Sequence, residues 1–205
     1  MNVTAPLLLA TWFVIAAIFA GPAIAAYLWL RSRGDSDERH LIVVPLVFVG
    51  LLACVAFAIF FVHPSLGRIF SYTVILCSWI AVVCFGRSPN SRQELSKLRR
   101  PFAVLLSCGC LYLALLYTPE LPFDAADVSA ARFVHQLPPD PVLPALLAEQ
   151  LYSGERPPPF FGDWLSSDRP PLQSGLFLLA LPWTDTFRLP PRLAYQCMGT
   201  LAQLL

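Results

Sequence analysis

The stretch APLLLATWFVIAAIFAGPAIAAYLWL, residues 5–30, decides the fold, because it contains 26 residues without a charge. The stretch LIVVPLVFVGLLACVAFAIFFV, residues 41–62, adds 22 more. The hydrocarbon core of a bilayer is about 30 Å thick, so a helix that rises about 1.5 Å per residue needs about 20 residues to cross it. We therefore expect both stretches to be membrane-spanning helices, in which the backbone satisfies its own hydrogen bonds within the lipid.

Two shorter uncharged runs follow at Ile69–Gly86 and Phe102–Thr118, with 18 and 17 residues. The later apolar segments Leu172–Trp183 and Leu193–Leu205 are weaker candidates, and the second continues to the last residue given. The sequence thus predicts an all-α polytopic membrane protein with four firm spans and one or two weaker ones.

The overall composition agrees with a membrane protein. Hydrophobic residues make up 57 % of the chain and charged residues only 13 %, against about 45–50 % and about 25 % in soluble domains. The mean hydropathy is +0.62. These values exclude a soluble enzyme, and a net charge of +1 with dispersed arginines argues against nucleic-acid binding.

A cleaved signal peptide is the alternative interpretation of residues 1–30. Against it, Met1–Thr4 contains no Lys or Arg, and the apolar run exceeds the about 7–15 residues of a signal-peptide core. Arg31 and Arg33 follow the run, as expected at the cytoplasmic end of a span. We therefore interpret the first stretch as a retained helix.

The six cysteines all lie in apolar segments, and we expect them to be small buried residues rather than disulfide partners. They are Cys54, Cys77, Cys84, Cys108, Cys110 and Cys197.

The orientation is predicted from the connections between the spans. Residues 31–40 carry three arginines and residues 87–100 carry five Lys or Arg, whereas residues 63–68 carry one. By the positive-inside rule the two basic connections are cytoplasmic, which places the N-terminus and the segment 119–173 outside. Arg188 and Arg192 then indicate a return of the chain to the cytoplasm.

The segment 119–173 has the composition of an ordered, acidic loop, with eight Asp or Glu against three Arg. The chain places 14 of its 20 prolines in Pro119–Pro191. One short helix is expected inside it: Asp140 suits the N-cap, and Gly154 suits the C-terminal stop. Its leucines repeat at helical spacing, at Leu143, Leu146, Leu147 and Leu151, which predicts an amphipathic helix on the membrane surface.

The order of motifs from Leu98 to Leu205, about half of the chain, resembles the start of the polyprenol-phosphate-dependent GT-C-type glycosyltransferases, such as protein O-mannosyltransferases and lipid A aminoarabinose transferases. The matching pieces are Asp140, Ala148-Glu149-Gln150-Leu151-Tyr152-Ser153-Gly154, Gly162-Asp163-Trp164 and Asp168-Arg169-Pro170. The family's pattern has Asp-Glu and Glu-Lys-Pro where this chain has Asp140-Pro141 and Asp168-Arg169-Pro170, and its members have more spans. The resemblance implies a three-helix N-terminal extension over residues 1–100 and the start of a transferase core over residues 101–205.

The resemblance also implies roles for three residues. Asp140 would act as a general base or orient the acceptor for inverting attack on the anomeric carbon. Arg169 would bind the lipid phosphate, and Asp168 would ligate a divalent metal ion; a planar guanidinium suits a phosphate. The simpler interpretations are that Asp140 only caps a helix and that Asp168 and Arg169 form a solvated ion pair.

The function expected from this resemblance is glycosyl transfer from a polyprenyl-phosphate donor at the extracytoplasmic face of a bacterial inner membrane, by this chain or by a longer protein that it begins. The alternative is a non-catalytic or vestigial membrane protein with a binding or assembly role. A transporter would call for ionisable residues inside the spans, and the four uncharged runs contain no Asp, Glu, Lys or Arg.

Overall fold

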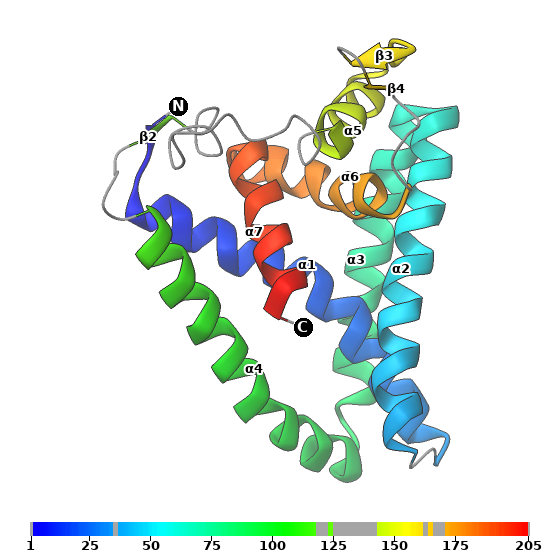
Figure 1. The fold of residues 1–205 in the computed structure, drawn as a ribbon. Helices are drawn as coiled ribbons and strands as arrows, with labels where there is room; N and C mark the ends of the chain where they lie inside the picture. The colour runs from blue at the N-terminus through cyan, green and yellow to red at the C-terminus, as the bar shows by residue number, and fades with distance from the viewer. Residues whose placement is uncertain are drawn as a thin grey trace.

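The computed structural model describes residues 2–34, 37–117, 123–124, 143–161, 164–165 and 171–204. Its helices are α1 (Ala5–Ser32), α2 (Glu38–Val62), α3 (Pro64–Phe85), α4 (Pro89–Tyr117), α5 (Leu143–Ser153), α6 (Pro171–Thr186) and α7 (Pro191–Leu204). Short antiparallel pairs join β1 (Asn2–Val3) to β2 (Phe123–Asp124) and β3 (Phe160–Phe161) to β4 (Trp164–Leu165). The described part of the chain thus consists of helices, two minimal strand pairs and short connections (Figure 1).

Helices α1 to α4 are each long and apolar enough to cross a membrane, which confirms the four firm spans. Three of them begin before their uncharged runs, and two of these three start with proline, at Pro64 and Pro89. Proline fits the first turn of a helix, where the missing N–H has no intrahelical partner. The predicted division between residues 100 and 101 lies inside α4, which continues through Pro101.

Helix α1 occupies the centre of the bundle and contacts α2, α3, α4 and α7. Its Trp12 is fully buried and donates a hydrogen bond from Nε1 to the Leu106 carbonyl of α4 at 3.2 Å. A side chain at Gly109 would overlap the Trp12 ring, so α4 approaches α1 here only because this residue is glycine. The apolar residues of α2, α3 and α4 remain largely exposed, as expected for helices that face lipid.

Helix α6 runs across the upper part of the bundle beneath α5 (Figure 1). It starts against the middle of α2, where a side chain at Gly175 would overlap the Ala53 carbonyl oxygen. It is then bonded to α3: Ser71 Oγ donates to the Leu179 carbonyl at 2.7 Å, and Tyr72 Oη donates to the Pro182 carbonyl at 2.8 Å. With 16 residues, α6 is about 24 Å long, which is shorter than the core of a bilayer.

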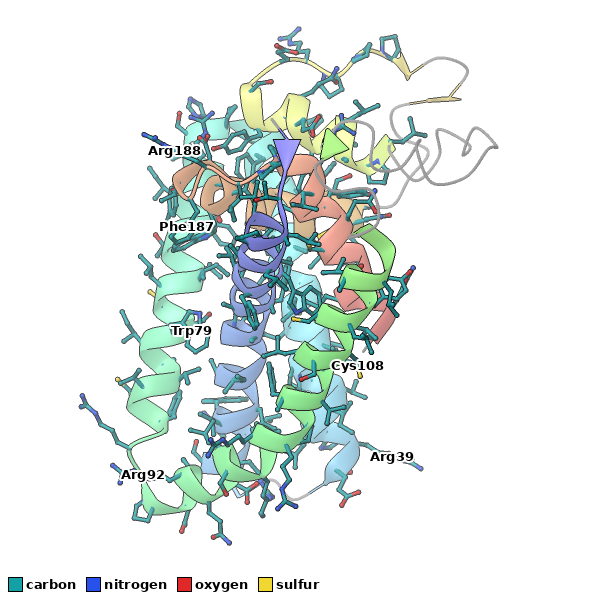
Figure 2. The ribbon with its side chains drawn as sticks, turned by 90° about the vertical axis from the view of Figure 1, so that its left-hand side faces the viewer. Arg39, Trp79, Arg92, Cys108, Phe187 and Arg188 are labelled. Atoms are coloured by element: carbon teal, nitrogen blue, oxygen red, sulfur yellow. The ribbon has the colours of Figure 1, made fainter. Side chains whose placement is uncertain are left out.

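The described structure separates two ends of the bundle (Figure 2). Arg39 and Arg92, which belong to the two basic connections between spans, lie at one end. Arg188 lies at the opposite end, and Arg192 pairs with Glu149 of α5 at 2.8 Å. The prediction that Arg188 and Arg192 mark a return to the basic side is therefore wrong, because α6 lies across the bundle and brings the chain back to the end at which it began.

Helix α5 confirms the expected short helix and its stop. Gly154 adopts φ +82° directly after the helix, and the Glu155 N–H donates to the Gln150 carbonyl at 2.9 Å, which closes the C-terminal turn. The apolar face of α5 packs against α6 within the main core, through buried residues such as Leu147 and Leu151. The expected membrane-surface helix is thus largely covered by protein rather than by lipid on that face.

The expectation of buried cysteines is wrong for most of them. All six are free, Cys197 is buried and Cys110 is partly covered, but Cys54, Cys77, Cys84 and Cys108 lie on exposed helix faces. Figure 2 shows Cys108 on α4. An apolar helix that faces lipid places small apolar residues on its outside as readily as inside, so burial could not be read from composition.

Candidate functional site

The three residues predicted for catalysis and ligand binding, Asp140, Asp168 and Arg169, lie outside the described residues, as does Asp163. Their chain neighbours are described, however. Leu143 begins α5 three residues after Asp140, and Pro171 begins α6 three residues after Asp168. The starts of α5 and α6 are therefore the described parts of the chain that follow the predicted residues in sequence.

The first turns of α5 and α6 are in contact. Ser174 Oγ donates a hydrogen bond to the Pro144 carbonyl at 3.1 Å, and both residues are buried. At the other ends of the same helices, Tyr152 Oη donates to Asp185 Oδ2 at 3.1 Å. The starts of the two helices are bonded to each other, and so are their ends, so α5 and α6 run in the same direction. Their N-terminal ends, which carry unpaired N–H groups and partial positive charge, lie together.

An apolar groove of about 300 Å³ opens beside the start of α6. Its walls come from five helices and include Phe19 of α1, Gly50 of α2, Leu105 of α4, Leu172 of α6 and Met198 of α7. It carries no charged side chain among its lining residues. A groove of this composition between membrane-spanning helices can accommodate a hydrocarbon chain.

A polar cluster covers the opposite end of the α5–α6 pair. The Arg68 guanidinium of α3 lies 4.4 Å from the centroid of the Tyr152 ring and donates to the Tyr152 carbonyl at 3.0 Å. Burial, reinforced by the Asp185 carboxylate that accepts its hydrogen bond, raises the pKa of Tyr152 to about 12. The phenol therefore remains protonated at neutral pH, and its hydrogen bond to Asp185 joins the end of α5 to the end of α6.

A second polar contact joins α5 to α7. Arg192 Nη2 lies 2.8 Å from Glu149 Oε2, and both side chains are about one-third exposed. Burial raises the pKa of the Glu149 carboxyl, and the nearby Arg192 charge opposes this shift without cancelling it. Glu149 is thus held by an ion pair in surroundings that disfavour its charge, which suits a structural contact that responds to pH.

The described residues contain no group of three His, Cys, Asp or Glu that could hold a metal ion. The predicted metal ligand, Asp168, is not among them. Carboxylate oxygens are the ligands preferred by hard divalent cations, so that prediction stays open at Asp168.

Sequence reasoning missed the contacts that order this region. Ser174 meets Pro144 across 30 residues of chain, and Arg192 meets Glu149 across 43. The only sequence signal for the second contact was Glu149, an acid that lies outside the row of leucines on α5. Nothing in a single sequence pairs that acid with Arg192, because the pairing depends on how α6 crosses the bundle.

Comparison of the chain with protein-family models, with curated proteins and with solved structures finds no match.

Proposed function

We propose that this chain is a membrane glycosyltransferase, or the N-terminal part of one, that transfers a sugar from a polyprenyl-phosphate donor to an acceptor. The observation that carries the proposal is the bond between the starts of α5 and α6, Ser174 to Pro144. It joins the two helix ends that follow Asp140 and Asp168. The resemblance assigns both acids to one site, and the contact between the helices that follow them supports this proposal.

The apolar groove supports the donor assignment. Leu172, one of its lining residues, follows Arg169 by three residues. A polyprenyl phosphate combines a long hydrocarbon chain with an anionic head group, so its site needs an apolar channel with a cation at the mouth. In this proposal the prenyl chain occupies the groove, and Arg169 binds the phosphate through a charge-assisted, bidentate contact.

The chemistry assigns one task to each proposed residue. Departure of the lipid phosphate develops negative charge, which the Arg169 guanidinium stabilises. The acceptor hydroxyl or amine loses a proton as it attacks the anomeric carbon, and the Asp140 carboxylate takes that proton. Asp168 would hold a divalent metal ion, which supplies further positive charge at the phosphate when bound.

The proposed location is the extracytoplasmic face of a bacterial inner membrane. The basic residues of the connections around Arg39 and Arg92 gather at one end of the bundle (Figure 2). The positive-inside rule assigns that end to the cytoplasm. The N-terminus, α5 and the start of α6 then belong to the outer half, where a lipid-linked sugar meets water.

The test uses the protein that carries this chain, reconstituted in nanodiscs with a polyprenyl-phosphate-linked sugar. Binding of the polyprenyl phosphate and transfer of the sugar are measured separately. We expect Asp140→Asn to leave binding unchanged and to reduce transfer by about 10²–10⁴-fold, the usual effect of losing a general base. Arg169→Gln should weaken binding by about tenfold or more, as for the loss of a hydrogen bond to a charged group.

Arg188→Gln is the matched control, because Arg188 lies at the same end of the bundle but on the connection between α6 and α7. It should change neither binding nor transfer. Unchanged transfer in Asp140→Asn, or binding that Arg169→Gln does not weaken, would overturn the catalytic assignment. The result would then favour the non-catalytic alternative, with which the structural use of Glu149 and Asp185 in helix contacts also agrees.

A further inference from the structure

A second cavity of about 610 Å³ lies at the end of α2, below the C-terminal turn of α5 and the segment 154–157. It shares no lining residue with the apolar groove. Its volume lies within the about 300–1,000 Å³ of ordinary ligand sites. The proposed glycosyl transfer makes no use of it.

The walls of this cavity are hydrocarbon, and its rim faces the bilayer. Phe60 and Leu151 form part of the wall and are almost fully buried, at 1 % and 4 % exposure. Phe61 and Val62, the last residues of the membrane-spanning α2, also line it and are 67 % and 79 % exposed. A ligand that enters over these two residues comes from the hydrocarbon layer around the protein rather than from water.

The other side of the cavity carries a cation. Arg156 lines it and is exposed, and no described carboxylate forms an ion pair with it. Arg68 lies close by: its guanidinium stacks on Tyr152, whose ring centroid is 6.0 Å from that of Phe60. Glu155 is the one acid among the lining residues. The Asp185 carboxylate, which accepts the hydrogen bond of Tyr152, lies on the Arg68 side of this cluster, so Arg156 is the cation that the lining itself offers.

We propose that this cavity binds an anionic phospholipid of the surrounding leaflet, with one acyl chain between α2 and α5 and the phosphate at Arg156. The depth of the site fits this occupant, because α2 ends here and lipid head groups lie at the ends of membrane-spanning helices. Arginine beside a membrane surface attracts anionic lipids, and its planar fork matches phosphate oxygens. The lipid would brace the junction of α5 with the α2–α3 hairpin.

The test compares lipid retention by the full protein in nanodiscs that contain equal amounts of phosphatidylglycerol and phosphatidylcholine, with no polyprenyl phosphate present. Native mass spectrometry counts the lipids that remain bound. We expect phosphatidylglycerol to be retained preferentially, and Arg156→Gln to reduce that preference by about fivefold, the contribution of one arginine near an anionic surface. Glu155→Gln should increase the preference. Arg92→Gln, an exposed arginine at the opposite end, is the control and should leave it unchanged.

A second pair of variants tests the apolar part. Phe61→Ala should lower retention of both lipids alike, because both carry acyl chains, whereas Leu66→Ala, an exposed residue of α3 that does not line the cavity, should not. Equal retention of the two lipids by the unaltered protein would overturn the proposal. So would release of the bound lipid by glycerol phosphate, which would show that a head group alone suffices. Because no donor is present, these outcomes are independent of glycosyl transfer.

Discussion

The two ends of the helix bundle are held together in different ways. At the basic end, Glu94 of α4 joins α1 through charged and polar side chains: it accepts from Tyr27 Oη at 2.7 Å and lies 2.9 Å from Arg31. At the opposite end, the side chains of α3 donate to backbone carbonyls of α6, as Ser71 does to Leu179. The contacts of Glu94 hold together two helices that each span the membrane. The contacts of Ser71 and its neighbour hold α6, which is too short to span, and so determine the position of a helix that lines the apolar groove.

This difference predicts that the opposite end depends on close backbone packing. Gly175→Leu should be the most damaging change, because the added side chain would meet the Ala53 backbone of α2. Neither helix can move away without breaking its neighbours' contacts, so we expect a loss of about 3 kcal/mol in the free energy of unfolding, at the upper end of overpacking effects. Denaturant-induced unfolding of the detergent-solubilised protein measures it.

Gly199→Ala supplies the control for that change. Gly199 also lies in a helix of this region, α7, but a Cβ there would meet nothing within 4 Å. Alanine favours a helix over glycine by up to about 1 kcal/mol, so this variant should be neutral or slightly more stable. Equal destabilisation by both variants would show that the crossing of α6 over α2 is not tightly packed.

The basic end should respond to loss of charge rather than to added volume. Glu94 accepts hydrogen bonds from Tyr27 and from Lys97, the latter at 2.7 Å, and its side chain is 13 % exposed. Glu94→Gln keeps the shape of the side chain but removes its charge, and hydrogen bonds to a charged group contribute about 1.5–3 kcal/mol. We therefore expect a loss of about 2 kcal/mol in the same unfolding measurement.

Glu38→Gln is the matched acid for comparison, because Glu38 is exposed in the first turn of α2 at the same end. It should cost only about 0.5 kcal/mol through the lost interaction with the helix dipole. If Glu94→Gln were no more destabilising than Glu38→Gln, the contact between α1 and α4 would rest instead on Trp12, which packs against Gly109 and donates a hydrogen bond to the Leu106 carbonyl.

The same contrast explains what the sequence could predict. Spans α1 to α4 follow from the length of uncharged runs, and the end of α5 follows from Gly154, because both signals are local. The path of α6 does not follow from a local signal, because its apolar segment is equally compatible with a weak membrane span. Helix α6 lies across the bundle because Gly175 has no side chain to collide with α2 and because two hydroxyl groups of α3 donate hydrogen bonds to its carbonyls. Neither feature of the sequence indicates the direction in which α6 runs.

The candidate site divides in the same way. The resemblance implies Asp140, Asp168 and Arg169 as site residues, and these stay a prediction; the described structure adds the contact between Ser174 and Pro144, at the starts of the helices that follow them. That contact could not be predicted, because it joins residues whose only shared property is their position in the first turn of a helix. Long-range pairing of this kind is set by packing, which a single sequence does not report.

The smallest expected effect lies at the opposite end, in the response of Glu149 to pH. Because burial raises its pKa, the folded protein holds this proton more tightly than the unfolded chain does. The contribution of Glu149 to stability is therefore most favourable below the ordinary carboxyl pKa of about 4.5 and is lost as the pH rises from there through the raised value. Unfolding measured between pH 4 and pH 8 should show this slope, and Glu149→Gln should flatten it.

Arg192→Gln distinguishes this titration from a general effect of pH on the membrane protein. The Arg192 charge opposes the rise in the pKa of Glu149, so removing it should raise that pKa further and steepen the slope that Glu149→Gln removes. Opposite changes in the two variants would establish that the α5–α7 contact carries the pH response. Identical slopes in both variants would mean that the response arises elsewhere, and that the ion pair, like many partly exposed pairs, only positions α7 against α5.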